Sequence, residues 1–205
     1  KWLLRLKIKK CKVISFGRQI NNTYVYKLKD KDQLHELERV DNITDLGVIL
    51  DSKLSFSEHI LAKIKKAYSM IGLIKRNFSS LSVSSFVMLY KSMVRSHLDY
   101  CNSVWAPFRK SDIDDLERVQ KRATKILPAL KKLSYTDRLK RCGLPTPSYR
   151  RARGDMIETY KILTGKYDES VAPTLALNKH RLTRGNDLKL EVKNSHYDLR
   201  KHFFT

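Results

Sequence analysis

The spacing of apolar residues changes near Ser57, and this change constrains the fold of the 205-residue chain more than any other feature. After Ser57, apolar residues recur every three or four positions, as on one face of an α-helix. The first set is Ile60, Leu61, Ile64, Ala67, Tyr68, Ile71 and Ile74. Before Ser57, short β-branched and aromatic runs alternate with turn residues, which favours strands. The chain therefore divides into a short β-rich part and a longer helical part.

The β-rich part contains four expected strands, separated by turns that contain Gly, Asn and Asp. They cover residues 11–16, 23–28, 34–40 and 46–50. The last strand leads into a turn at residues 51–53. A small antiparallel set of hairpins of this size is not stable alone, so it needs a partner surface.

The helical part contains five expected helices. They begin near Ser57, Ser82, Ser111, Tyr135 and Ser148. Ser57 is a candidate N-cap, and Ser111 with Asp114 has the spacing of a capping box. The sequence thus predicts an α+β fold, predominantly α. A small antiparallel β-hairpin region covers residues 1–55, a helical bundle residues 56–165, and a loop-rich extension anchored by Phe203 and Phe204 residues 166–205.

The charge of the chain is strongly positive and unevenly distributed. Forty-two basic residues face 21 acidic ones, a formal net charge of +21, and residues 118–153 carry twelve basic residues against the single acid Asp137. Such a chain attracts polyanions, with nucleic acid the first expectation and an anionic membrane surface the second. Contacts of Lys and Arg to phosphate are independent of base sequence and weaken with salt. The alternative interpretation is that these basic residues form only a solvated helical face.

Familiar catalytic motifs are absent from the sequence, which lacks a Gly-rich phosphate loop, an HExxH motif and a Cys/His zinc spacing. The adjacent carboxylates Asp114 and Asp115 are expected in the first turn of a helix, where they complement its dipole. A two-metal site needs such a pair on a tight hairpin, so no metal site is predicted. No apolar run approaches the roughly 18 residues of a membrane span, and no membrane partner is expected.

Several short motifs extend in order along nearly the whole chain. They are Trp2 with KCKV (residues 10–13) and FG (16–17), DLGVILD (45–51), HI (59–60), GLIKRNF (72–78), YKSMVRSHLDYC (90–101), VWAP (104–107), LERVQKRATK (116–125), LSY (133–135), RGDMIE (153–158), TRG (183–185) and RKHFF (200–204). Together they resemble the non-LTR (LINE-type, jockey-like) retrotransposon reverse transcriptases. Two positions depart from the family pattern, since Lys7 stands where Asn is usual and Ser96 where Pro is commoner.

This resemblance implies that residues 1–55 form the C-terminal edge of the polymerase palm and residues 56–165 the thumb. A thumb grips the template–primer duplex, here an RNA–DNA hybrid, through its sugar-phosphate backbone. Lys10 matches the family's lysine proposed to protonate the leaving pyrophosphate. The primer grip falls on Leu46, Gly47, Val48 and Ile49. The expected phosphate contacts are Lys63, Lys66, Arg76, Arg118, Lys121, Arg122 and Lys125.

The resemblance also places the catalytic aspartates and their Mg²⁺ upstream of this chain, and the family pattern continues beyond its last residue. We therefore expect a fragment of an RNA-directed DNA polymerase that holds the duplex, needs the missing palm and fingers, and contains no cofactor itself. Whether the fragment is an enzyme stays open, and its expected location is intracellular, in nucleus and cytoplasm. Two alternatives remain: a non-enzymatic nucleic-acid-binding remnant of such an element, and a helical protein-interaction domain.

Overall fold

The computed structural model describes residues 7–17, 20, 23–30, 33–178, 188–191 and 194–196. The chain divides into two compact units, Lys1–His59 and Ile60–Thr205, and helix predominates over strand in the described residues. The predicted α+β fold, predominantly α, is confirmed. Trp2 and the motifs at residues 183–185 and 200–204, including the Phe203–Phe204 anchor, lie outside the described residues.

The described residues of the first unit form three two-stranded pairings. Its elements are the 3₁₀ turn η1 (Ile8–Lys10), β1 (Lys12–Val13), β2 (Lys27–Asp30), β3 (Gln33–Glu36), β4 (Glu38–Arg39), β5 (Asn42–Asp45) and β6 (Val48–Asp51). β2–β3 is an antiparallel hairpin, as expected, with Lys27 opposite Glu36. β5–β6 is also an antiparallel hairpin, with Asn42 opposite Asp51, but β5 is not among the expected strands. β1 instead pairs with β4 in parallel. A parallel pair needs a long connection, which the residues between these two strands supply.

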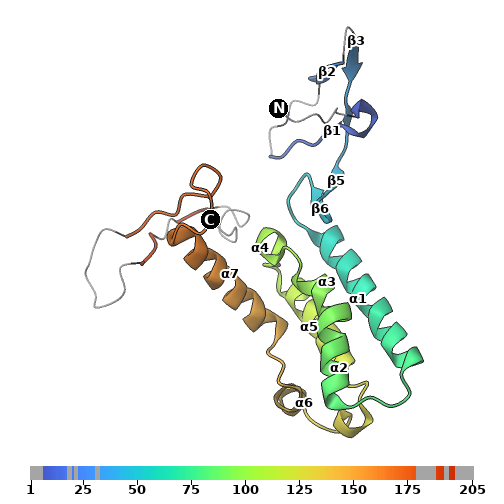
Figure 1. Ribbon diagram of the computed structural model, residues 1–205. Helices are drawn as coiled ribbons and strands as arrows, with labels where there is room; N and C mark the ends of the chain where they lie inside the picture. The colour runs from blue at the N-terminus through green and yellow to red at the C-terminus, as the bar shows by residue number, and fades with distance from the viewer. Residues whose placement is uncertain are drawn as a thin grey trace. The chain divides into compact units, whose positions relative to one another are not determined.

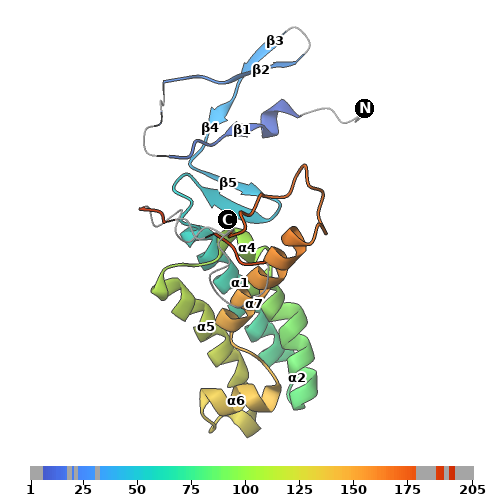
Figure 2. The ribbon, with the colours of Figure 1, turned by 90° about the vertical axis from the view of Figure 1, so that its left-hand side faces the viewer.

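The second unit, which we call the helical unit, is a helical bundle. It begins at Ile60, within the first turn of α1. Its elements are α1 (Ser57–Asn77), α2 (Val83–Leu89), the π-helical η2 (Tyr90–Arg95), α3 (Ser96–Asp99), α4 (Asn102–Trp105), α5 (Lys110–Thr124), the 3₁₀ turn η3 (Pro128–Leu130), α6 (Tyr135–Cys142) and α7 (Pro147–Leu163). α7 packs against α4 and α5, and α6 packs against α2 and α5 (Figures 1 and 2). The helix predicted to begin near Ser82 is present from Val83 to Asp99, with a π-helical middle.

Side-chain caps fix three of the helix starts close to their predicted positions. The hydroxyls of Ser82, Ser134 and Thr146 accept hydrogen bonds from the backbone amides three residues later, which satisfies donors that a helix start leaves unpaired. α6 ends at Gly143, whose φ of 59° lies in the left-handed region that glycine adopts without strain.

Two predicted caps are wrong. Ser57 is the first helical residue of α1 rather than its N-cap. Ser111 lies inside α5, because Arg109 is already extended and its carbonyl accepts the amides of Asp112 and Ile113, which starts the helix at Lys110. The first-turn acid of α5 is therefore Asp112, and the Asp114–Asp115 pair follows it.

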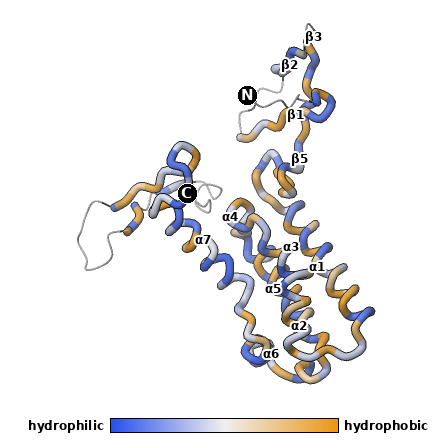
Figure 3. The backbone as a smooth tube through the Cα atoms, viewed as in Figure 1, coloured by the Kyte–Doolittle hydropathy of each residue, from blue (hydrophilic) through white to orange (hydrophobic). Residues whose placement is uncertain are grey.

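The core of the helical unit follows the predicted apolar stripes. Its buried apolar residues include Ile60, Ile64, Ala67, Ile71, Ile74, Phe86, Tyr90, Val94, Leu98, Trp105, Leu116, Val119, Ala123, Leu127, Leu130, Leu139, Cys142 and Leu144. Hydrophobic and hydrophilic stretches accordingly alternate along the helices (Figure 3). Leu61 departs from its predicted place, since 52% of it is exposed.

Candidate nucleic-acid interface

The basic cluster of residues 118–153 is partly surface and partly core. Nine of its twelve cations are exposed, whereas Arg150 is half-buried and Arg138 and Arg151 are buried. Buried cations hold the fold together rather than meeting a polyanion. The surface available to phosphate is therefore smaller than the sequence count suggests.

Four of the predicted phosphate-binding residues share one face of α5. Arg118, Lys121, Arg122 and Lys125 are exposed at the C-terminal half of the helix and its cap, with Lys121 and Arg122 each three or four residues from Arg118 and from Lys125. Residues at this spacing lie on one side of an α-helix, about 10 Å from first to last at roughly 1.5 Å per residue. The opposite side of α5 carries the buried Leu116, so packing fixes the direction of the cations. We call these four residues the α5 basic stripe.

Neighbouring side chains hold the stripe in place. The Lys121 ammonium lies 5.3 Å from the ring centre of Tyr135, and the Arg122 guanidinium lies 5.3 Å from that of Tyr68. Cation–π contacts of this length restrict both side chains. Arg118 Nη1 forms an ion pair with Asp115 Oδ1 at 2.7 Å, so a phosphate would have to share this guanidinium. Lys121, Arg122 and Lys125 are thus the stronger members of the stripe.

The predicted contacts on α1 belong to a different surface. Lys63 lies 5.9 Å from the ring centre of Tyr100, and Lys63 and Lys66 lie near His97. Tyr68, which meets the α5 basic stripe, follows Lys63 by five residues, a rotation of about 140° on a helix with 3.6 residues per turn. Lys63 and Lys66 therefore occupy the flank of α1 beside α3. Arg76 is exposed in the last turn of α1.

His97 is an electrostatic reporter for that flank. Burial and the nearby Lys66 and Lys63 lower the pKa of His97 below its ordinary value, because all three disfavour the imidazolium. A phosphate bound by the two lysines would offset their charge and raise the pKa of His97 again. The titration of this histidine therefore reports on anion binding at Lys63 and Lys66.

In the first unit, the predicted primer-grip residues form the tip and one strand of the β5–β6 hairpin. Leu46 and Gly47 make the turn, with φ of 43° and 80°, the signs of a type I′ hairpin. They therefore stand outside the strand predicted over residues 46–50, and β6 starts only at Val48. Leu46 is 82% exposed, while Val48 is buried and Ile49 half-buried. Lys10 is exposed at the end of η1.

Two residues that were not among the predicted site residues fix the segment between this hairpin and α1. Asp51 Oδ1 accepts hydrogen bonds from the amides of Lys53 and Ser55, and Oδ2 accepts from the Ser55 hydroxyl and the Phe56 amide. The fully buried His59 accepts from the Ile49 amide through Nδ1 at 3.1 Å. Asp51 ends the motif at residues 45–51 and His59 begins the motif at residues 59–60, so the fold itself requires a residue in each of these motifs.

Replacing Asp51 with Ala should loosen the loop that leads into α1. Phe56 has a φ of 54°, a strained value that the Asp51 carboxylate holds through the Phe56 amide. We expect amide exchange of Ser55 and Phe56 to accelerate about 30-fold, equivalent to roughly 2 kcal/mol of local stability. Asp51→Asn keeps one acceptor oxygen and should have a smaller effect. The exposed Asp41 gives a matched control, and equal exchange in Asp41→Ala and Asp51→Ala would contradict this role.

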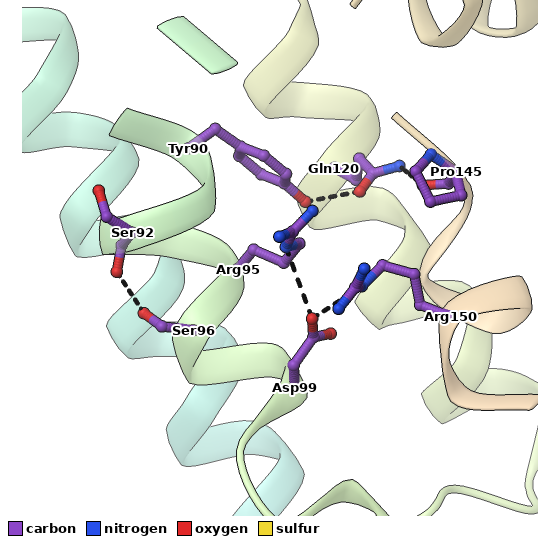
Figure 4. Close-up of polar contacts among 8 residues, drawn as sticks. All are labelled: Tyr90, Ser92, Arg95, Ser96, Asp99, Gln120, Pro145 and Arg150. Atoms are coloured by element: carbon purple, nitrogen blue, oxygen red, sulfur yellow. Dashed lines mark hydrogen bonds and ion pairs between the residues drawn. The ribbon is translucent and has the colours of Figure 1, made fainter. Parts of the chain in front are cut away.

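A buried polar network anchors α5, and the sequence did not reveal it. The Tyr90 hydroxyl donates to Gln120 Oε1 at 2.6 Å, and Gln120 Nε2 donates to the Pro145 carbonyl at 2.9 Å (Figure 4). Gln120 Nε2 also donates to the Tyr135 hydroxyl at 3.2 Å. The Tyr135 hydroxyl donates to Glu117. Burial, as the largest cause, raises the pKa of both phenols, so both remain protonated donors. Gln120 thereby connects α5 to η2, α6 and the segment before α7.

Ion pairs add a second link between the helices. Asp99 Oδ2 lies 2.8 Å from Arg150 Nε and 3.5 Å from Arg95 Nε, which joins α3 to α7 (Figure 4). The buried Arg138 donates to Thr124 Oγ1 at 3.0 Å and to the Leu133 carbonyl at 2.7 Å. The basic cluster thus contains two kinds of cation: those that bond to other parts of the fold and those that are exposed.

Neither a metal cluster nor a membrane-spanning helix occurs in the described part of the chain. No three His, Cys, Asp or Glu side chains gather there to hold a metal ion, and no helix there is long and apolar enough to cross a membrane. Comparison of the chain with protein-family models, curated proteins and solved structures finds no match.

Proposed function

We propose that the helical unit holds a template–primer duplex through the α5 basic stripe, as the thumb of a LINE-type reverse transcriptase. The observation that carries this proposal is the stripe itself, with Lys121, Arg122 and Lys125 exposed on one helix face and aimed by packing. Lysine and arginine in such a row contact successive phosphates without reading bases. An RNA–DNA hybrid is a suitable ligand for such a row, because a reverse transcriptase must hold this duplex whatever its base sequence.

The β5–β6 hairpin supports the same proposal from the first unit. Its tip presents the exposed Leu46 and the backbone of Gly47, which has no side chain to keep a ligand away. A primer end held at this tip would meet an apolar side chain and backbone amides, as a primer grip requires. Under this proposal the polymerisation chemistry belongs to the metal-binding aspartates of the complete polymerase, and this chain contributes positioning.

The test is an NMR titration of the full chain with a 16-base-pair RNA–DNA hybrid. We expect the largest shifts at the backbone amides of Lys121, Arg122 and Lys125, because the bound phosphates lie beside them. We also expect the pKa of His97 to rise on binding, since Lys63 and Lys66 are predicted contacts. Unchanged α5 signals at saturation would overturn the proposal. An unchanged His97 alone would remove Lys63 and Lys66 from the interface.

A further inference from the structure

Two neighbouring depressions open on the helical unit beside α2 and α6, away from the α5 basic stripe. One has a volume of about 780 Å³ and is lined by Val83, Ser84, Val87, Met88, Lys91 and Cys142. The other has a volume of about 720 Å³ and is lined by Val83, Ala129, Leu130, Leu133, Asp137, Lys140 and Arg141. Because Val83 lines both, they form one feature, which we call the α2–α6 groove.

The floor of the groove is aliphatic and accessible. Met88 is 65% exposed and Leu133 is 40% exposed, so both side chains can contact an apolar ligand. None of the described residues that line the groove is aromatic. Methionine adapts its shape to an incoming apolar side chain and is common at surfaces that bind helices.

The rim of the groove is positively charged. Lys91, Lys140 and Arg141 lie there with one acid, Asp137, whose Oδ2 already accepts the Ser134 hydroxyl at 2.6 Å. The sequence from residue 78 to residue 98, which includes all of α2 and η2, contains no acidic residue. An apolar floor between cations therefore complements an apolar stripe between carboxylates.

We propose that the α2–α6 groove docks an amphipathic, acidic helix of a partner protein. From Val83 to Lys91 the groove follows α2 and the start of η2 for about 12 Å, at roughly 1.5 Å per residue, which matches two turns of a second helix. Leucine-type side chains at i, i+3, i+4 and i+7 would fill the floor, the usual arrangement of a helix in a groove. Glutamates beside them would pair with Lys91, Lys140 and Arg141.

The same observations disfavour the other occupants. Single-stranded nucleic acid binds by stacking its bases on aromatic side chains, and the described lining offers none. A second copy of this chain carries the same net charge of +21, so its approach would bring cations against cations. The inference is independent of duplex binding, because the groove and the α5 basic stripe share no residue.

The experiment measures binding of the full chain to a fluorescein-labelled 14-residue peptide of Leu and Glu, by fluorescence anisotropy. In one peptide the leucines are spaced i, i+3, i+4 and i+7, and in a second peptide of the same composition they are spread around the helix. We expect the first peptide to bind at least 10-fold more tightly. Met88→Glu should weaken its binding at least 10-fold, because it removes an apolar anchor and repels glutamate.

Met156 provides the matched control, since it is 73% exposed on α7 and lines neither depression. Met156→Glu should bind the first peptide as the unmodified chain does. Met88→Ser removes the anchor without adding charge, and should weaken binding about 5-fold if Met88→Glu proves unfolded by circular dichroism. Equal binding of the two peptides, or no effect of either Met88 variant, would overturn the proposal. A single-stranded RNA 12-mer serves as competitor. The proposal would also be overturned if this RNA displaced the peptide and Met88→Glu abolished binding of the RNA itself.

Discussion

Reversing the charge of the α5 basic stripe should abolish duplex binding. In the variant Arg118→Glu/Lys121→Glu/Arg122→Glu/Lys125→Glu, we expect the affinity for an RNA–DNA hybrid at about 100 mM salt to fall at least 100-fold. All four side chains are exposed, so the substitutions remove phosphate contacts and add repulsion without disturbing the core. Glutamate is a good helix former, which keeps α5 intact.

A second quadruple variant separates this local effect from the general loss of charge. Lys65, Lys75, Arg153 and Lys166 are exposed and lie outside the stripe, so their reversal changes the net charge by the same amount. We expect the control variant to lose no more than about 5-fold in affinity, through weaker long-range attraction. Fluorescence anisotropy with one hybrid at one salt concentration measures both variants. Equal losses would mean that the stripe has no special role.

Replacing Gln120 with Leu should be the most damaging single substitution that leaves the volume of the core nearly unchanged. The Gln120 side chain is 1% exposed, and its loss removes the partner of the Tyr90 hydroxyl and of the Pro145 carbonyl. Each buried polar group left without a partner costs roughly 1–3 kcal/mol. We expect the free energy of unfolding to fall by about 3 kcal/mol, a large share of the roughly 5–15 kcal/mol of a typical domain.

Urea unfolding of a small set of variants checks this expectation. Tyr90→Phe removes one hydroxyl and leaves only Gln120 Oε1 without its donor, so about 1.5 kcal/mol should be lost. Tyr149 is 61% exposed, and Tyr149→Phe should leave the midpoint unchanged. A Gln120→Leu chain as stable as the Tyr149→Phe control would show that the network contributes little.

The sequence predicts the helices well because burial and capping act locally. The stripe from Ile60 to Ile74 determines which side of α1 is buried, and a serine or threonine cap adjoins α2, α6 and α7. The parallel β1–β4 pair escapes prediction, since it joins residues 26 positions apart whose alternation says nothing of direction. Leu46 likewise escapes prediction, because it is apolar and begins the apolar run predicted as a strand, yet it forms part of the hairpin turn.

The candidate interface was likewise predictable from the sequence only in part. The spacing of Arg118, Lys121, Arg122 and Lys125 places them on one helix face, and the structure confirms that arrangement. Burial of Arg138 depends on Thr124 and the Leu133 carbonyl, which tertiary packing brings together. The separation of Lys63 from the stripe likewise depends on which helix lies beside each flank of α1. A charge count along the sequence contains neither fact.

The central claim, that the helical unit grips a duplex by its phosphates, is tested most directly by a salt titration of binding to an RNA–DNA hybrid. With about six phosphate contacts, the logarithm of the affinity should fall linearly with that of the salt concentration, by roughly a thousandfold between about 50 and 200 mM. Two hybrids of unrelated sequence should give the same line, because backbone contacts read no bases. Weak binding that salt does not change would contradict the account and leave the basic residues as a solvated surface.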